Sequence, residues 1–295
     1  MSDFFDNSNF LYKYVSFNVF SLKMLIEGKL WFGEPKNLND PNEGEFIIEN
    51  VNELSEKNII NIKKELNPDI PPESFKYIYN GSGIRDFERE YFELMKTKLK
   101  SWFGIVSFSQ KHENILLWTH YTGSHMGMCI VFDRELLYSS IKAELGEVEI
   151  CAAKYVKEVP KIKIEFDQND YPMIDGYHVL KHKNNCFKYE EEIRLIKYFS
   201  PGNNLDRFVK FDKTAIKAVI FGENMPNADR RTVAHILKST VVYNNVRYFQ
   251  STKNFVTRNM RIEKLNGQSL IEVFKDFGVK HDFSGGIWTP KDFKY

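Results

Sequence analysis

Residues 10–32, FLYKYVSFNVFSLKMLIEGKLWF, predict the order strand, helix, strand. The first strand is Phe10–Val15 and the second is 29–32. Between them, Ser16 can cap a helix that ends at Gly28, because Ser is a common N-cap and Gly a common helix stop. The helix has one apolar stripe at helical spacing, formed by Val19, Leu22, Leu25 and Ile26.

The rest of the chain repeats both kinds of element. Strands are expected at 104–109, 127–132, 148–156 and 189–198, and helices at 114–121, 133–146 and 177–183. A strand–helix–strand unit is expected at 218–221, 228–238 and 241–243, and the last fifty residues hold weak strands and an irregular tail. Residues 50–100 are expected to form a helical insertion or flap, interrupted by prolines that end helices. Residues 157–175 are expected to form a loop or a second flap. Strands and helices alternate only partly, which predicts a single mixed α+β domain over 1–295.

Composition excludes some classes of protein. The chain has 295 residues, 42% of them hydrophobic, and its 25 Phe, 15 Tyr and 4 Trp are too many for a disordered protein. The 41 Lys+Arg and 40 Asp+Glu leave a net charge of +1, which argues against an obligate binder of duplex DNA. A small anionic ligand needs only a local pocket, so it stays possible.

Location follows from what the sequence lacks. Three cysteines without a C-x-x-C motif encode neither a disulfide framework nor a zinc ribbon. The acidic N-terminus does not resemble a signal peptide, and the longest apolar runs, 115–118 and 126–132, are too short to span a bilayer. We therefore expect a soluble cytoplasmic protein.

The sharpest chemical feature is the segment YEEEIRLI at 189–196. On a strand, Glu190, Glu192 and Arg194 would share one face, with neighbouring carboxylates roughly 6–7 Å apart. One carboxylate could then stay ionised and hold a substrate hydroxyl while the other is partly protonated. The alternative is a solvated strand face in which Arg194 forms a local salt bridge.

Three further segments carry polar or aromatic groups. Trp118, His120 and Tyr121 could form a wall for a planar ring, or simply belong to the aromatic core. The segment NDPNE at 39–43 has the residues typical of a turn. Lys13-Tyr14 on the first strand does not by itself indicate a site. His178 and His182 could share a helix face, but no third ligand is evident, so no metal site is predicted.

As an ordered set, these segments resemble a widespread bacterial family of unknown function. That family is marked by N-D-P-[FY]-E, W-x-H-Y and W-x-Y-E-x-E-x-R motifs, and the resemblance covers residues 10 to about 245. Asn42 stands where the family usually has an aromatic residue, and Phe187 where it usually has Trp.

A second resemblance, to toxin-type ADP-ribosyltransferases, implies a fold and a function. It rests on the opening order of a strand, a helix and an I-x-G-K-L motif, and on a late strand that bears E-x-E. It implies two small sheets with an NAD cleft between them. Glu192 or Glu190 would be the catalytic acid, with His120 and Tyr121 near the nicotinamide. The predicted NAD-binding residues are Lys13, Tyr14, Asn39, Asp40, Trp118 and Arg194. Lys13 or Tyr14 replaces the Arg or His usual on the first strand, and Arg194 could orient the glutamates or pair with the pyrophosphate.

The resemblance implies transfer of ADP-ribose from NAD to a protein or nucleic acid, or hydrolysis of NAD, in a bacterial toxin or anti-phage system. A protein partner or antitoxin is possible, and no membrane is expected. One alternative is a non-catalytic module that senses a nucleotide or protein. Another is a nuclease in which Glu190, Glu192 and Asp40 gather Mg²⁺. A component whose flap at 50–100 docks a partner is compatible with all of these.

Overall fold

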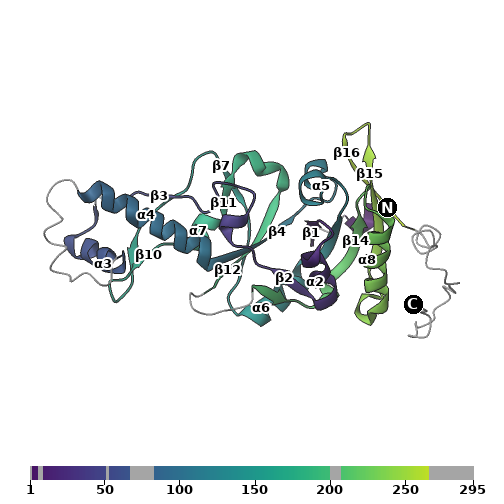
Figure 1. Ribbon diagram of the computed structural model, residues 1–295, viewed down its shortest axis with the longest axis horizontal. Coiled ribbons are helices and arrows are strands. Elements are labelled where there is room, and N and C mark those ends of the chain that lie inside the picture. Colours follow the sequence, from purple (N-terminus) through teal and green to yellow (C-terminus); the bar gives the residue numbers. More distant parts are fainter. Residues whose placement is uncertain (1, 6–8, 51–52, 67–82, 200–206, 266–295) are drawn as a thin grey trace.

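A computed structural model describes residues 2–5, 9–50, 53–66, 83–199 and 207–265 (Figure 1). Its centre is an eight-stranded mixed sheet with the strand order β16-β15-β14-β5-β1-β4-β12-β6. Within this sheet β14 and β15 pair in parallel, and the other neighbours pair antiparallel. The strands of the sheet are β1 (Phe10–Val15), β4 (Phe103–Ser109), β5 (Met128–Asp133), β6 (Glu149–Ala152), β12 (Glu192–Tyr198), β14 (Ile216–Phe221), β15 (Arg247–Asn254) and β16 (Asn259–Lys264). The predicted mixed α+β class is confirmed.

Shorter elements surround this sheet. In the described ranges there are also four two-stranded sheets. Their pairs are β2 (Lys29–Trp31) with β13 (Phe208–Lys210), β3 (Ile47–Ile48) with β8 (Lys161–Ile162), β9 (Glu165–Phe166) with β10 (Pro172–Met173), and β7 (Lys154–Val156) with β11 (His182–Asn184). The α-helices are α1 (Ser2–Phe5), α2 (Val19–Glu27), α3 (Glu56–Leu66), α4 (Gly83–Trp102), α5 (Ile115–Tyr121), α6 (Arg134–Leu145), α7 (Gly176–Leu180) and α8 (Asn227–Ser239). The 3₁₀ helices used below are η1 (Pro35–Asn37), η4 (Asn185–Glu190) and η6 (Val241–Tyr243). No helix in the described ranges is both long enough and apolar enough to cross a membrane.

The large sheet is nearly divided between β1 and β4. These two strands are in register at one pair, Tyr12 opposite Ser109, whereas β1 and β5 pair along their whole length. Strand β4 in turn pairs along its whole length with β12. The resemblance implied two small sheets. The structure has one sheet whose two halves meet at a single pair and spread apart beside it.

The central strand β5 is buried on both faces, and its side chains alternate between two hydrophobic clusters. Met128, Ile130 and Phe132 pack in the larger cluster with apolar side chains of α2, α6 and α8. Cys129 and Val131 pack on the opposite face with Leu117 and Trp118 of α5. The two-residue period of a strand puts successive side chains on opposite faces. A continuous apolar run such as 128–132 is therefore what a strand covered on both sides requires.

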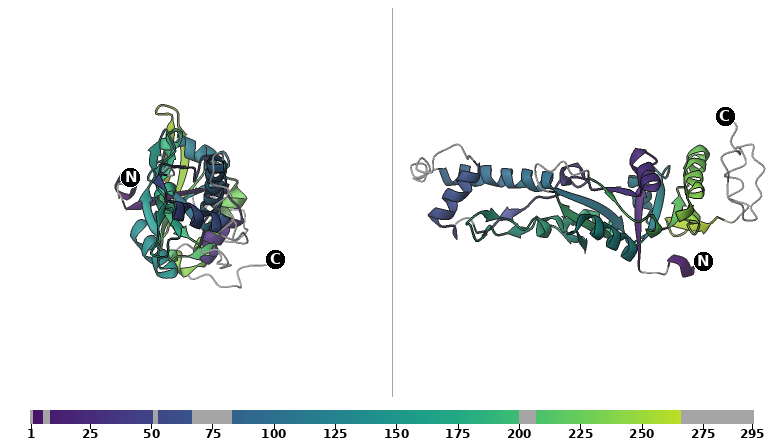
Figure 2. Two further views of the ribbon diagram at one scale, coloured as in Figure 1. Left: turned by 90° about the vertical axis from the view of Figure 1, so that its left-hand side faces the viewer. Right: turned by 90° about the horizontal axis from the view of Figure 1, so that it is seen from below.

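Helices α3 and α4 extend away from the large sheet as an elongated arm (Figure 2). Strands β3, β8, β9 and β10 lie along this arm. Their shared core includes Ile62, Met95, Leu99, Ile162 and Ile164. The insertion expected at 50–100 and the second flap expected at 157–175 are therefore packed together. Parts of the insertion, residues 51–52 and 67–82, lie outside the described ranges.

Two local predictions, the N-cap of α2 and the strand at 241–243, were wrong. The N-cap of α2 is Asn18, which accepts hydrogen bonds from Phe20 N and Ser21 N and forms a capping box with Ser21. Asn18 lies directly before the helical residues, whereas Ser16 is too far upstream and donates instead to Tyr121 O. Residues 241–243 form η6 rather than a strand, and the parallel partner of β14 is β15.

Two expected strands are also divided. The 148–156 segment becomes β6, which joins the large sheet, and β7, which pairs with β11. The 189–198 segment begins with the end of η4, and β12 starts only at Glu192. Glu191 adopts a left-handed conformation with φ of 43° between them. This residue turns the chain from one element into the next, so the expected alternation of side chains does not extend back to Glu190.

Candidate functional site

A cavity of about 360 Å³ opens where β1 and β4 spread apart. Both strands contribute to it, as do η1, α5 and the segment from β11 to β12. Its lining includes Tyr12, Lys13, Tyr14, Trp31, Asn39, Ser107, Phe108, Tyr121, Lys183, Glu190 and Glu192. Six of the ten predicted site residues are in this set: Lys13, Tyr14, Asn39, Tyr121, Glu190 and Glu192. The sequence segments that carry them lie up to 179 positions apart, from Lys13 to Glu192.

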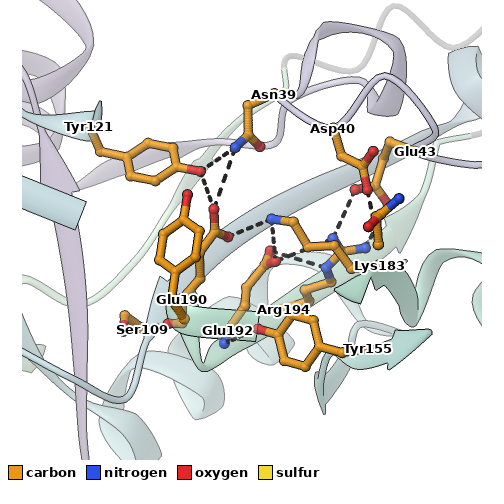
Figure 3. A network of polar contacts seen from close by, with 12 residues as sticks. Asn39, Asp40, Glu43, Ser109, Tyr121, Tyr155, Lys183, Glu190, Glu192 and Arg194 are labelled. Atoms are coloured by element: carbon orange, nitrogen blue, oxygen red, sulfur yellow. Dashed lines mark hydrogen bonds and ion pairs between the residues drawn. The ribbon is translucent and has the colours of Figure 1, made fainter. Parts of the chain in front are cut away.

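Glu190 is the last residue of η4, and its carboxylate is almost completely buried. The Tyr121 hydroxyl donates to Oε1 at 2.5 Å, and Asn39 Nδ2 donates to the same oxygen at 3.4 Å. Lys183 Nζ donates to Oε2 at 2.5 Å (Figure 3). Ser109 Oγ holds the Glu190 backbone carbonyl at 2.7 Å. The carboxylate is thus fixed at the cavity wall by donors from three other elements.

Glu192 shares the same lysine but lies deeper. Its Oε2 accepts from Lys183 Nζ at 2.8 Å, and Arg194 Nε donates to its Oε1 at 3.0 Å. Burial alone would raise the pKa of Glu192, but the charges of Arg194 and Lys183 outweigh it and lower the pKa to about 2. The backbone N–H of Glu192 donates to the Tyr155 hydroxyl at 2.8 Å. Glu192 is therefore an ionised carboxylate near neutral pH, and both of its oxygens bind cationic side chains.

Arg194 is completely buried behind the cavity wall. Its guanidinium binds Glu43 through two parallel contacts of 2.6 and 2.8 Å, and it also donates to Leu180 O at 2.6 Å. With Glu192 included, all three guanidinium nitrogens are used. In this arrangement Arg194 orients the glutamate, one of the two expected roles, and it does not line the cavity.

Asp40 also lies outside the cavity lining, although Asn39 beside it is part of it. The two Asp40 oxygens accept backbone N–H groups of Asn42 at 2.8 Å and Asn184 at 3.1 Å. The first contact is the local turn chemistry expected of an Asn-Asp-Pro segment. The second contact anchors this turn to the end of β11, one residue beyond Lys183.

The expected aromatic wall is only partly present. Tyr121 lines the cavity, and burial together with its hydrogen bond to Glu190 raises the pKa of its hydroxyl. Trp118 is completely buried behind β1, where its indole N–H donates to His112 O at 2.9 Å and its ring packs edge-on against Tyr14 at 5.2 Å. His120 is exposed, with its ring 6.4 Å from that of Tyr189. His120 points away because adjacent helical residues face different directions. Trp118 is three residues from Tyr121, and its contacts with His112 O and the Tyr14 ring place it behind the cavity lining.

The first-strand pair contributes in two ways. Lys13 Nζ donates to Ser107 O at 2.9 Å across the opening between β1 and β4, and it lies 5.3 Å from the centre of the Phe108 ring. Burial lowers the pKa of Lys13 to about 8, against an opposing attraction from Glu192. The Tyr14 hydroxyl donates to Lys111 O at 2.8 Å, so its proton is already used within the protein.

Lys183, which links the two glutamates, was not predicted as a site residue. It was expected at the end of a helix, whereas it lies on the short strand β11. Its partners are seven and nine residues away across an irregular turn, so no periodicity marks it. Glu43 was also given no role of its own, although it belongs to the NDPNE segment.

The histidine pair gains no further ligand in the structure. The rings of His178 and His182 are 4.8 Å apart, and His182 Nδ1 lies 2.8 Å from His178 O. Within the described ranges, no group of three or more His, Cys, Asp or Glu residues is arranged to hold a metal ion.

Part of the chain is similar to a known family. Residues 117–195 match the family model described as Protein of unknown function (DUF2971). This span contains Tyr121, Lys183, Glu190 and Glu192 but not β1 or the NDPNE turn. No curated protein and no solved structure matches the chain.

Proposed function

We propose that the protein consumes NAD, as an ADP-ribosyltransferase or an NAD glycohydrolase, with Glu190 as the catalytic carboxylate. The observation that supports this most directly is the position of Glu190. It is a buried carboxylate at the wall of the cavity, held by Tyr121 and Asn39 on one oxygen and by Lys183 on the other. Glu192 is the weaker candidate, because two cations, Arg194 and Lys183, hold its carboxylate, whereas among the described residues Lys183 is the one cation bound to Glu190. The proposed role of Glu192 is to position Lys183.

The charge of the wall suits the reaction. Breaking the bond between nicotinamide and ribose passes through an oxocarbenium-like state that carries positive charge. Glu190 and Glu192 share one ammonium group, that of Lys183, so the three side chains together carry one net negative charge. The Arg194 charge is matched by Glu43. The side of the cavity formed by these residues therefore carries one net negative charge before the transition state forms, and Lys13, which lines the same cavity, offsets it only while protonated.

The shape of the cavity suits a ligand with a planar ring. Five aromatic side chains line it: Tyr12, Tyr14, Trp31, Phe108 and Tyr121. Its volume of about 360 Å³ is near the lower end of the range for small-molecule pockets, roughly 300–1,000 Å³. We therefore place the nicotinamide and its ribose inside, with the remainder of the dinucleotide outside.

The test is nicotinamide release from NAD by the purified protein, alone and with cell extract. Glu190→Gln removes the charge with little change of shape, and we expect release to fall by roughly 10²–10³-fold, the size of effect of one preorganised electrostatic group. The matched control is Glu191→Gln, because Glu191 is the adjacent residue and its side chain is exposed. Dependence on extract would indicate transfer to a macromolecule rather than hydrolysis.

Equal activity of Glu190→Gln and Glu191→Gln would show that Glu190 is not the catalytic carboxylate. Absence of release by a folded protein, with or without extract, would contradict the NAD-consuming function. NAD binding measured by calorimetry would then support the second candidate, a non-catalytic sensing module. One observation favours that candidate: both Glu190 oxygens have protein partners, as in a rigid recognition site.

The geometry does not favour the nuclease. Lys183 Nζ stands between Glu190 and Glu192, in the place where a bridging metal ion would have to sit. Asp40, the third expected ligand, accepts two backbone N–H groups and lies outside the cavity lining.

A further inference from the structure

Two lysines line the cavity, and their surroundings are opposite. Lys183 is held between two carboxylates, Glu190 at 2.5 Å and Glu192 at 2.8 Å. Lys13 donates to the backbone carbonyl of Ser107 at 2.9 Å and lies against the Phe108 ring. Within the described part of the chain, no carboxylate forms an ion pair with Lys13. One ammonium is therefore compensated by two carboxylates in direct contact, and the other by a neutral acceptor, an aromatic face and the weaker attraction of Glu192.

This difference changes which form of each side chain is stable. Although burial lowers it, the pKa of Lys183 is raised overall by Glu192 and Glu190, so this residue stays a cation. Lys13 has a pKa of about 8 because burial disfavours its charge. At pH 7.5 roughly a quarter of Lys13 would be the neutral amine, against roughly one in a thousand for an ordinary lysine. A desolvated lysine of this kind is a typical amine nucleophile.

We propose that Lys13 is a covalent nucleophile that attacks C1 of the ribosyl group bound in this cavity. The inference rests on the proposed NAD-consuming function and adds an intermediate to it. It also gives Lys13 a role different from the electrostatic contact to NAD that the resemblance implied. The cavity supplies what the step needs, since Lys13 and the glutamate wall line the same space.

The step balances without an oxidant or reductant. The lone pair of Nζ forms a bond to C1 while the bond from C1 to the pyridinium nitrogen breaks, and nicotinamide leaves neutral with that electron pair. The resulting ammonium loses a proton to water. The bond from C1 to the ring oxygen then opens, this oxygen takes up a proton, and C1 and Nζ form a protonated imine. Hydrolysis of the imine releases ADP-ribose and restores the amine.

The experiment traps that imine. The protein of residues 1–295 is incubated with NAD and sodium cyanoborohydride, which reduces an imine to a stable secondary amine. Adducts are then located by peptide mass spectrometry. Nicotinamide release is measured in parallel without the reductant. A second sample receives ribose 5-phosphate, an aldehyde sugar that needs no bond cleavage. We expect adducts at Lys13 to exceed those at any other lysine by at least about tenfold, given the larger neutral fraction.

Three controls separate reaction at this position from general glycation. Lys13→Arg keeps a donor for Ser107 O, and we expect it to lose the adduct and at least about tenfold of nicotinamide release. Lys111→Arg removes a half-exposed lysine near the site, and we expect it to change neither readout. Lys183 lines the same cavity but is ion-paired, so the wild-type protein should carry no adduct there.

Each outcome decides a separate claim. Nicotinamide release with a reduced ADP-ribosyl adduct on Lys13 supports both proposals. Release without an adduct at Lys13, from a folded wild-type protein, overturns the nucleophile and leaves the NAD-consuming function standing. An adduct from ribose 5-phosphate at Lys13 without nicotinamide release supports the reactive amine but overturns the NAD-consuming function. Absence of both adducts and of release overturns both proposals.

Discussion

Replacement of Arg194 by methionine would test whether the buried ionic chain holds the site together. The side chain is completely buried and makes five hydrogen bonds, two to Glu43, two to Glu192 and one to the Leu180 carbonyl. Methionine has a similar length but no charge and no donor. The variant would leave the carboxylates of Glu43 and Glu192 buried without their main partner.

The expected cost comes from that loss of compensation. Removing one partner of a buried ion pair usually costs about 3–5 kcal/mol, because the remaining charge stays desolvated. Lys183 still neutralises part of the Glu192 charge, so we expect about 4 kcal/mol rather than the sum over all contacts. A loss of this size is a large fraction of the roughly 5–15 kcal/mol by which domains are stable.

Urea unfolding at pH 7, followed by circular dichroism, measures this loss. The matched control is Arg261→Met, because Arg261 pairs with Glu263 at 3.0 Å on the exposed strand β16. Exposed pairs contribute little, so we expect a change below about 0.5 kcal/mol. The double variant Arg194→Met, Glu43→Gln removes one uncompensated charge and should recover part of the lost stability. If Arg194→Met costs less than about 1 kcal/mol with an unchanged denaturant slope, the compensation argument is wrong.

Three further predictions follow from single residues. The pKa of Glu192 is lowered to about 2 in the folded state, so its charge contributes about 3 kcal/mol to the free energy of unfolding. This contribution is complete above pH 4.5 and is lost as the pH falls toward 2. Acid unfolding curves of Glu192→Gln should lack this part of the pH dependence. Gly127→Ala would place a Cβ 2.1 Å from Val15 O, a backbone atom of β1. We expect thermal unfolding to show a loss of at least about 2 kcal/mol in the free energy of unfolding. A smaller loss would contradict the packing of this turn against β1. Tyr121→Phe removes the hydroxyl that donates to Glu190. We expect nicotinamide release to fall by about 10–100-fold, with a change of no more than a few degrees in the melting temperature. Unchanged release would show that this hydroxyl does not position the carboxylate.

Much of the framework could be predicted because it depends on local patterns. Strand β1, helix α2 and the buried strand β5 follow from runs of apolar residues and their period. A strand buried on both faces needs a continuous apolar run, and 128–132 provides one. Errors fell at element ends such as Ser16 and at Glu191, where one residue in a left-handed conformation changes the direction of the chain.

The candidate site was only partly predictable, because its residues come from segments that are distant in the sequence. Glu190 and Glu192 were paired on the assumption of one continuous strand, which proved wrong. They still lie together because both bind Lys183. Trp118 and Arg194 were selected for their chemistry, yet the fold buries both behind the cavity wall.

Sequence alone thus determined which segments form the strands and helices of an α+β fold, since local periodicity reflects which face of each element is buried. It also marked the polar residues around which a site could form. Only the tertiary structure decided that β1 and β4 separate beside Tyr12 and Ser109 and leave a cavity there. It likewise decided that Lys183 lies between two carboxylates, whereas Lys13 binds a backbone carbonyl. The physical reason is that burial and charge compensation are properties of neighbours in space, which no local pattern encodes.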